Sequence, residues 1–171
     1  VVITNGEAVV TREFINTLPA LKLIAVFGVG YDGVDVAAAR DAGVDVTHTP
    51  GVLTDDVADL AMGLMLAVSR KIVAAQKFIE QAGWQNSGFQ WTRKVSGKRL
   101  GILGMGRIGQ ALARRAMACG MNVVYYNRTR LAHELETTYQ TRRLKLAELL
   151  AISDVISLHT PLTDQTWHLI D

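Results

Sequence analysis

The amino-acid sequence predicts an α/β protein built on doubly wound parallel sheets. Strand and helix patterns alternate along two separate blocks, which is typical of parallel strands joined by helical crossovers. A glycine-rich loop lies between a strand and a helix of the second block, and a content of 49% hydrophobic and 20% charged residues is typical of a core-forming protein. The 171 residues fit one ordinary domain or parts of two small ones. We expect part of one domain over residues 1–51 and part of a second over 52–171, with both folds incomplete.

Short apolar runs predict the strands of the first block. Residues 1–3 read as a strand, and KLIAVFG at 22–28 ends in glycine, as a buried parallel strand does. A helix is predicted over about 34–42, and Gly43 suits the left-handed position that follows a helix. VDVTHTP at 44–50 is the next predicted strand, which its terminal proline stops.

A long helix is predicted next. Thr54 is the expected N-cap, and Asp55 and Asp56 lie in the first turn, where the helix dipole favours negative charge. Apolar residues recur at spacings of three and four, which predicts one buried stripe made of Val57, Leu60, Ala61, Leu64, Met65, Val68 and Ile72. Residues 83–99, rich in glycine, tryptophan and polar side chains, are expected to form a surface connection.

The second block reads as β-α-β-α-β, one mononucleotide-binding half of a doubly wound fold. Gly120 is expected to end its first helix. The predicted elements are a strand at 99–103, a helix from the glycine loop to about Cys119, a strand at 121–126, a weaker helix at 144–151 and a strand at 154–161.

The glycine loop has the sequence GMGRIG and includes Arg107 and Ile108. A G-x-G-x-x-G pattern alone is weak, but here a strand precedes it, a helix follows, and a second strand ends roughly twenty residues on. Gly104 would allow the tight turn, Gly106 the approach of backbone amides to a pyrophosphate, and Gly109 close helix–strand packing. The free amides at the helix start would bind the anion. The alternative is a tight turn without a ligand.

The tip of the second strand determines which dinucleotide is expected. A carboxylate there would bind the adenine ribose of NAD and repel a 2′-phosphate, but VVYYNRTR places Asn127, Arg128, Thr129 and Arg130 at this point. A guanidinium suits a phosphate, so the pattern favours NADP (NADPH), with NAD as the less favoured cofactor. Alternatively, the arginines only solvate a surface turn.

Composition argues against several classes of function. A net charge of +2, without basic tracts, argues against nucleic-acid binding. The apolar stretch 57–68 contains Asp59 and is too short and too charged to span a bilayer. Cys119 is the single cysteine, which favours a reducing, cytoplasmic compartment and an inert buried role for the thiol. The sequence has no cluster of Cys, His and carboxylates at the spacing of metal ligands, so no metal site is expected.

The sequence from about Lys22 onward resembles the D-isomer-specific 2-hydroxyacid dehydrogenases, and most of all the glyoxylate/hydroxypyruvate (and 2-ketogluconate) reductases. The resemblance is carried, in order, by AVFGVGYDGVDVAAARDAGVDVTHTPGVLTDDVADLAMGLMLAVSRK, GILGMGRIGQALARRA and SDVISLHTPLTDQTWHLI. It implies a Rossmann nucleotide-binding domain and a flavodoxin-like substrate domain.

The same resemblance implies roles for individual residues. Backbone amides of Val29 and Gly30 would hold the substrate carboxylate; the alternative is a turn that only shapes the substrate domain. Residues 106–109 would bind the pyrophosphate, and residues 127–129 the adenosine phosphate. His159, Thr160 and Pro161 would lie beside the ribose and nicotinamide side of the cofactor.

No catalytic residue is expected in this chain. The family's catalytic arginine, glutamate and histidine all lie C-terminal to the matched motifs, so we expect a portion of a protein of about twice this length. His159 ends a strand where α/β sheets bind ligands, but the resemblance argues against an acid–base role for it. His48, His133 and His168 are expected to have packing or surface roles.

The expected activity is NADPH-dependent reduction of a small 2-oxo acid of the glyoxylate, hydroxypyruvate or 2-ketogluconate type. One alternative is a non-catalytic, dinucleotide-sensing corepressor or scaffold of the same fold. Another is an NAD-linked 3-phosphoglycerate dehydrogenase, which the arginines at 128 and 130 disfavour. The resemblance also implies a homodimer formed with the helix from about Thr54.

Overall fold

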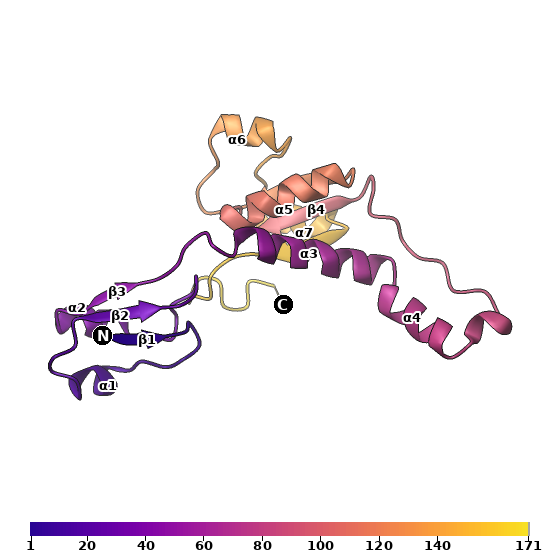
Figure 1. Cartoon of the computed structure of the whole chain (residues 1–171). Coiled ribbons are helices and arrows are strands. Elements are labelled where there is room, and N and C mark those ends of the chain that lie inside the picture. The colour runs from indigo at the N-terminus through magenta and orange to yellow at the C-terminus, as the bar shows by residue number, and fades with distance from the viewer. Residues whose placement is uncertain (171) are drawn as a thin grey trace. The chain divides into compact units, whose positions relative to one another are not determined.

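A computed structural model describes residues 1–170 of the chain (Figure 1). The chain divides into two compact units, unit 1 over Val1–Leu53 and unit 2 from Thr54 onward. Each unit has a three-stranded parallel sheet with helices between its strands, so the predicted α/β class and parallel sheets are confirmed.

Unit 1 has the strand order β1-β2-β3. Its core gathers around the central strand, where Ile24 and Val26 are buried. The Asp35 carboxylate accepts a hydrogen bond from the Ala38 amide at 2.7 Å and begins the second helix, and Gly43 follows that helix with φ +65°. The elements are β1 (Val2–Thr4), α1 (Arg12–Asn16), β2 (Leu23–Val26), α2 (Val36–Asp41) and β3 (Asp45–Thr47).

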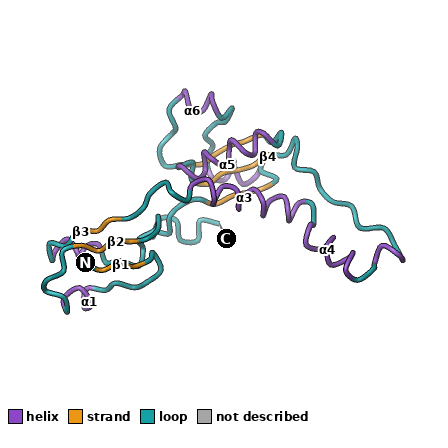
Figure 2. Tube along the Cα trace, in the orientation of Figure 1, coloured by secondary structure: helices purple, strands orange, loops and turns teal. Residues whose placement is uncertain are grey.

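Unit 2 has the strand order β5-β4-β6, with β4 in the centre. Strands are orange in Figure 2, where β4 is labelled. Gly101 of β4 lies opposite Val124 on one side and Ile156 on the other. Because β4 is flanked by strands and covered by helices, its Leu100 and Ile102 are fully buried. The elements are β4 (Arg99–Leu103), α5 (Arg107–Ala118), β5 (Asn122–Tyr126), α6 (His133–Thr138), α7 (Leu146–Ile152) and β6 (Val155–Leu158); α6 was not predicted.

The long helix differs from its prediction. It is divided at Lys71, whose φ is +52°, into α3 (Thr54–Ser69) and α4 (Ile72–Glu80), and Thr54 is already helical rather than a cap. The buried residues of α3 are Ala58, Met62 and Met65. Most of the predicted stripe is instead exposed, namely Val57, Leu60, Leu64, Val68 and Ile72. The helix has apolar side chains on more than one face, so the neighbour it packs against, the alanine-rich α5, determines which face is buried.

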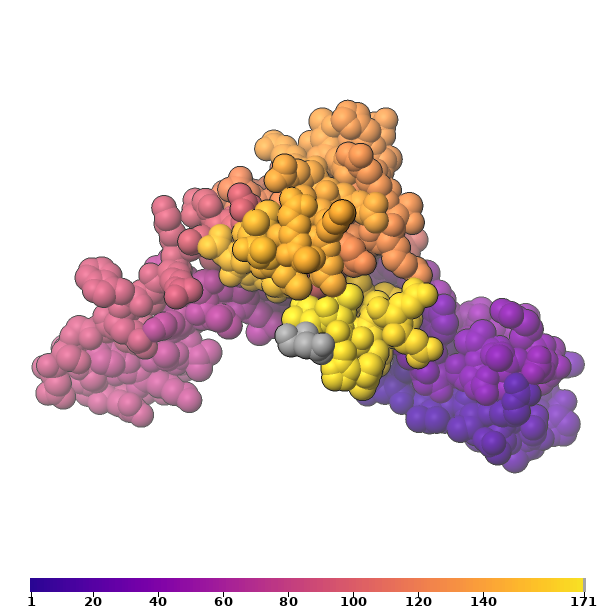
Figure 3. Space-filling model, turned by 180° about the vertical axis from the view of Figure 1, so that it is seen from behind, coloured from indigo at the N-terminus to yellow at the C-terminus, as the bar shows by residue number. Residues whose placement is uncertain are grey.

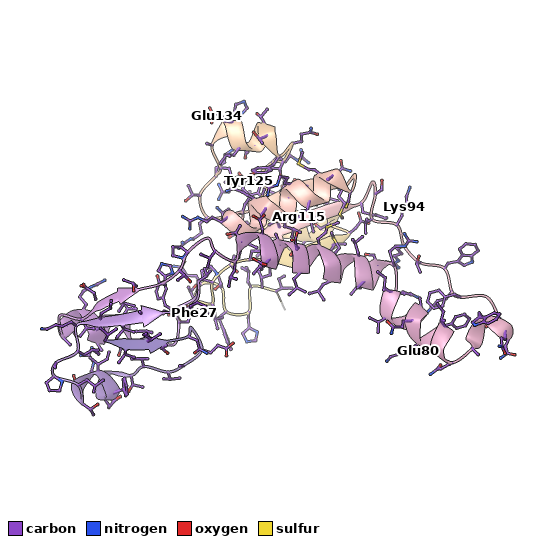
Figure 4. All side chains as sticks on the ribbon, viewed as in Figure 1. Phe27, Glu80, Lys94, Arg115, Tyr125 and Glu134 are labelled. Carbon is purple, nitrogen blue, oxygen red and sulfur yellow. The ribbon has the colours of Figure 1, made fainter. Side chains whose placement is uncertain are left out.

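Acidic residues of α3 pair with arginines of α5. The Arg115 guanidinium, labelled in Figure 4, contacts the carboxylates of Asp55 (3.0 Å) and Asp59, and Arg114 contacts Asp55 at 3.2 Å. These hydrogen bonds raise the pKa of Arg115. Both carboxylates are mostly exposed, so the pairs orient the two helices and add little to stability.

Irregular segments complete unit 2. Residues after α4 contain the short helix η1 (Gly83–Gln85) and then run as coil to β4, with Trp91 98% exposed. The surface connection predicted for 83–99 is therefore confirmed up to the start of β4. The coil after β6 lies on the surface, in yellow in Figure 3, with Leu162 and Trp167 exposed. Across residues 1–170, no helix is long and apolar enough to cross a membrane.

Candidate functional site

The glycine loop joins the carboxyl end of β4 to the start of α5. Gly104 has φ +95°, and a Cβ there would lie 2.6 Å from the carbonyl oxygen of His159. A Cβ on Gly109 would collide with the Gly104 carbonyl, whereas one on Gly106 would meet nothing within 4 Å. Two of the glycines are therefore required by the fold, and Gly106 borders open space, where a ligand could approach the backbone.

A run of backbone amides in this loop has no hydrogen-bond acceptor. The Gly104 amide donates to Tyr126 O at 3.0 Å, and the Gln110 amide donates to Gly106 O at 2.9 Å. Between them, the amides of residues 105–109 donate to no atom of the chain as far as it is described. Met105 and Gly109 are buried, and buried amides are nearly always paired. Such a run at a helix N-terminus, with the helix dipole behind it, fits a pyrophosphate.

Residues 159–161, which follow β6, lie against this loop. The His159 amide donates to Leu103 O at 2.7 Å, and its carbonyl oxygen faces Gly104. Thr160 is half-buried and Pro161 is exposed. The imidazole Nε2 lies 2.8 Å from Ser157 Oγ, and burial lowers the pKa of His159. The side chain is therefore neutral near pH 7.

The tip of β5 places the four predicted residues in unlike surroundings. The Asn127 side-chain amide donates to Thr129 O at 3.0 Å. Arg128 is exposed, and its guanidinium makes no hydrogen bond or ion pair within residues 1–170. Arg130 is paired with Glu136, with Nη2 at 2.7 Å from Oε2. From the sequence, Arg128 and Arg130 were expected to play the same part, but in the structure only Arg130 is paired.

Glu136 is the centre of a buried polar network. Its side chain is only 7% exposed and accepts three hydrogen bonds from Arg130 and one, at 2.6 Å, from the hydroxyl of Tyr125, labelled in Figure 4. The Tyr125 hydroxyl in turn accepts from the Leu131 amide at 2.9 Å. Arg130 and then Tyr125 lower the pKa of Glu136 to about 2, while burial and the hydrogen bond to Glu136 raise that of Tyr125.

Arg143 belongs to the same region, and the sequence did not predict it. Its Nε donates to Asn127 O at 2.9 Å, and its Nη2 donates to Arg128 O at 2.8 Å. A parallel bridge between Tyr125 and Arg143 brings the segment before α7 alongside β5. No local motif marks this arginine, because the contact depends on how the chain returns after α6.

In unit 1, the turn after β2 carries the predicted substrate amides. The amides of Val29 and Gly30 donate to no atom in the described part of the chain, and Val29 O lies 2.9 Å from His48 Nδ1. The ring of His48 also meets Tyr31 edge-on at 5.0 Å. A Cβ on Gly6 would collide with the Gly30 carbonyl, so a second loop packs closely on this turn. Neither Gly6 nor His48 was singled out as a site residue from the sequence.

A cavity of about 1010 Å³ lies elsewhere in unit 2, between α3 and β6. Its walls include Leu64, Met65, Val68, Ile156 and Leu158, and His159 borders it. This lining is largely apolar, whereas the loop at residues 104–109 provides convergent amides. The amides, and not the size of the cavity, identify the candidate anion site.

Comparisons with known proteins agree with this geometry. The sequence profile described as D-isomer specific 2-hydroxyacid dehydrogenase, NAD binding domain, matches residues 62–171. Glyoxylate reductase of Thermococcus litoralis is 47% identical over an alignment of 167 residues that covers 94% of this chain and 50% of that protein. Hydroxyphenylpyruvate reductase of Plectranthus scutellarioides is 42% identical over 170 residues, 99% of this chain and 53% of that protein.

A solved structure shows the same similarity. The crystal structure of TT0316 protein from Thermus thermophilus superposes with a TM-score of 0.88 at 43% identity, covering 98% of this chain and 52% of that one. The chain therefore spans about half the length of the curated relatives it matches.

Proposed function

Because the chain belongs to the D-isomer specific 2-hydroxyacid dehydrogenase family, we propose that the whole protein reduces a small 2-oxo acid to the D-2-hydroxy acid with NADPH. The substrate is of the glyoxylate, hydroxypyruvate or 2-ketogluconate type. Relatives named glyoxylate reductase and hydroxyphenylpyruvate reductase match nearly the whole chain, which supports a 2-oxo acid. The run of unpaired amides over 105–109 is the single observation that carries the proposal.

Each part of the site would bind one part of the cofactor. The amides of 105–109 hold the pyrophosphate, and residues 127–130 face the adenosine end. Residues 159–161 would lie beside the ribose and nicotinamide, and the packing of the His159 carbonyl on Gly104 supports this assignment. When bound, the nicotinamide supplies the hydride for reduction of the carbonyl. The neutral His159 imidazole, hydrogen-bonded to Ser157, has no carboxylate partner in the described residues and is not assigned as the proton donor.

Unit 1 is assigned to the substrate domain and unit 2 to the dinucleotide-binding domain. The unpaired amides of Val29 and Gly30 at the end of β2 would bind the carboxylate of the 2-oxo acid. His48 would hold the turn by donating from Nδ1 to the Val29 carbonyl. This arrangement favours a substrate with a carboxylate beside its carbonyl.

A homodimer in the cytoplasm completes the proposal. The apolar side chains of Leu60, Leu64 and Val68 on α3 are exposed, the last two at the edge of the cavity beside β6, which suits burial against a second copy. The single cysteine suits a reducing compartment. Sedimentation of the whole protein at two concentrations tests the dimer, and a monomer at both would contradict it.

The test of activity follows the absorbance of reduced nicotinamide in the whole protein. With glyoxylate or hydroxypyruvate, NADPH should be consumed, with a preference over NADH of about tenfold or more in kcat/KM, equivalent to about 1.4 kcal/mol. Tight NADPH binding without turnover of any 2-oxo acid would contradict the enzyme and favour a dinucleotide-sensing scaffold. A preference for NADH would contradict the choice of NADP.

A further inference from the structure

We infer that Arg143 positions Arg128 for the adenosine 2′-phosphate of the proposed NADPH, and that Arg130 takes no part in phosphate binding. The inference rests on the proposed use of NADPH and assigns separate tasks to three arginines around the tip of β5. Two of them looked equivalent in the sequence, and the third was not considered there.

Arg130 is committed to a buried carboxylate. Its Nε lies 3.0 and 3.1 Å from the two oxygens of Glu136, and its Nη2 lies 2.7 Å from one of them. This bidentate pair neutralises the guanidinium charge locally. Moving Arg130 to a phosphate would leave the Glu136 carboxylate buried without its cation, which is strongly unfavourable. Arg130 therefore stabilises the segment between β5 and α6.

Arg143 keeps its positive charge while it holds the backbone of the loop. Its guanidinium donates to the carbonyls of Asn127 and Arg128 at 2.9 and 2.8 Å. Carbonyl oxygens carry no net charge, so these bonds orient the two peptide groups without neutralising the arginine. The Arg143 guanidinium therefore restrains the backbone of both Asn127 and Arg128, and so restrains the position of the Arg128 Cα.

Arg128 is the guanidinium that remains available. It is exposed, and in the described chain its side chain has no acceptor. Its backbone is held by Arg143 on one side, and the Asn127 side chain binds the Thr129 carbonyl on the other. A free guanidinium on a held backbone loses little conformational freedom when it binds a phosphate.

The experiment measures binding of adenosine 2′,5′-bisphosphate and of AMP, which differ only in the 2′-phosphate, to the whole purified protein by calorimetry. The ratio of the two affinities reports the 2′-phosphate independently of turnover. Arg128→Gln should lower this ratio about tenfold or more. Arg143→Gln should lower it about fivefold, and Arg130→Gln should leave it unchanged while lowering the thermal unfolding midpoint. Arg142→Gln is the matched control, because it removes the same charge from an exposed neighbour whose guanidinium makes no hydrogen bond or ion pair in residues 1–170.

Two further variants separate positioning from charge. The double variant R128Q/R143Q should lower the affinity ratio no more than R128Q alone does, since Arg143 acts through Arg128. Arg143→Lys keeps the charge but cannot bind two carbonyls with a planar fork, so it should behave like Arg143→Gln. Additive losses in the double variant, or full rescue by lysine, would overturn the positioning role.

The remaining outcomes are equally decisive. A loss of the ratio in Arg130→Gln as large as in Arg128→Gln would overturn the separation of tasks. Equal wild-type affinity for the two nucleotides would overturn the inference together with the choice of NADP. The expected ranking without reduction of any 2-oxo acid would support the inference and contradict the proposed enzyme. Reduction of a 2-oxo acid with NADPH, together with a different ranking of the variants, would support the proposed enzyme and contradict the inference.

Discussion

The turn after β4 and the turn after β2 end the central strands of two parallel sheets, and both expose unpaired amides. The two turns differ in whether the glycines that allow close backbone packing belong to the turn itself or to another loop. In unit 2, Gly104 and Gly109 contact each other within one loop, and the second one begins the close packing of α5. In unit 1, the turn at residues 28–33 is packed against a separate loop that contains Gly6.

The difference shows how two proposed anion sites of similar chemistry can depend on different lengths of chain. The loop of unit 2 is followed by a helix of 12 residues, so a helix dipole adds to its amides. The turn of unit 1 precedes a non-helical stretch, and α2 starts only at Val36. The first site is therefore local and supported by a dipole, whereas the second depends on tertiary packing and on His48. Substitutions in each turn can test this contrast.

The largest effect is expected at Gly104. Gly104→Ala should destabilise unit 2 by roughly 1–3 kcal/mol from the left-handed backbone alone, with a further cost from the collision with His159 O, and should abolish NADPH binding. Gly106→Ala is the control, because its Cβ would meet nothing. It should change stability by less than about 0.5 kcal/mol yet weaken NADPH about tenfold or more. Thermal unfolding measures the stability of the two variants, and cofactor titration measures their NADPH affinity. Equal stability of the two variants would contradict the strain and collision described for Gly104.

In unit 1, the corresponding substitution is Gly6→Ala. The added methyl would collide with the Gly30 carbonyl, and the forced shift should cost about 1–3 kcal/mol and raise the KM for the 2-oxo acid while the NADPH affinity stays unchanged. Gly28→Ala, whose Cβ would make ordinary contacts at 3.8 Å or more, should retain stability. If Gly6→Ala weakened NADPH as strongly as the oxo acid, the two sites would not be separate in the way described.

Acid should affect unit 2 through a group that unit 1 lacks. Among residues 1–170, the buried polar residues are Glu136 and Thr141, both in unit 2. The pKa of Glu136 is lowered from 4.5 to about 2, so its pairing stabilises the fold fully above about pH 4.5 and is lost as the pH falls toward 2. The difference in unfolding midpoint between wild type and Glu136→Gln should be largest near neutral pH and shrink through this window. A difference independent of pH would contradict the ion pair.

The smallest effect is expected at His48. His48→Ala removes the contact with Val29 O, worth about 0.5–1.5 kcal/mol, and should raise the KM for the 2-oxo acid a few-fold without changing NADPH affinity. His48→Asn retains an N–H donor and should restore much of the loss. Steady-state kinetics with saturating NADPH measure this; no change in either variant would show that the turn is held without His48.

Much of unit 2 could be predicted from the sequence because its signals are local. The strand, glycine loop and helix over 99–118 were predicted almost to the residue, and the glycine spacing assigned separate tasks to Gly104 and Gly109 that their surroundings support. The family resemblance rests on the same local motifs, and the matched profile confirms it. The assignment of ligands to these residues stays a prediction.

Other features were beyond the sequence because they depend on which segments meet. The apolar positions of α3 were visible, but packing against α5 selected Ala58 and Met62 and left Leu64 outside. Arg128 and Arg130 are two residues apart and chemically identical. Their difference arises from Glu136, which lies in α6, and from Arg143, which approaches after the chain has turned through α6.

The sequence by itself therefore determined the fold class, the position of the glycine loop and the family, because backbone conformation and strand–helix periodicity are set by neighbouring residues. The tertiary structure alone decided which helix face is buried, which arginine remains free and which glycine supports the turn of unit 1. Burial and side-chain pairing depend on which side chains meet in the folded chain, and a carboxylate such as Glu136 pairs with a cation only when folding places the two groups within hydrogen-bond distance.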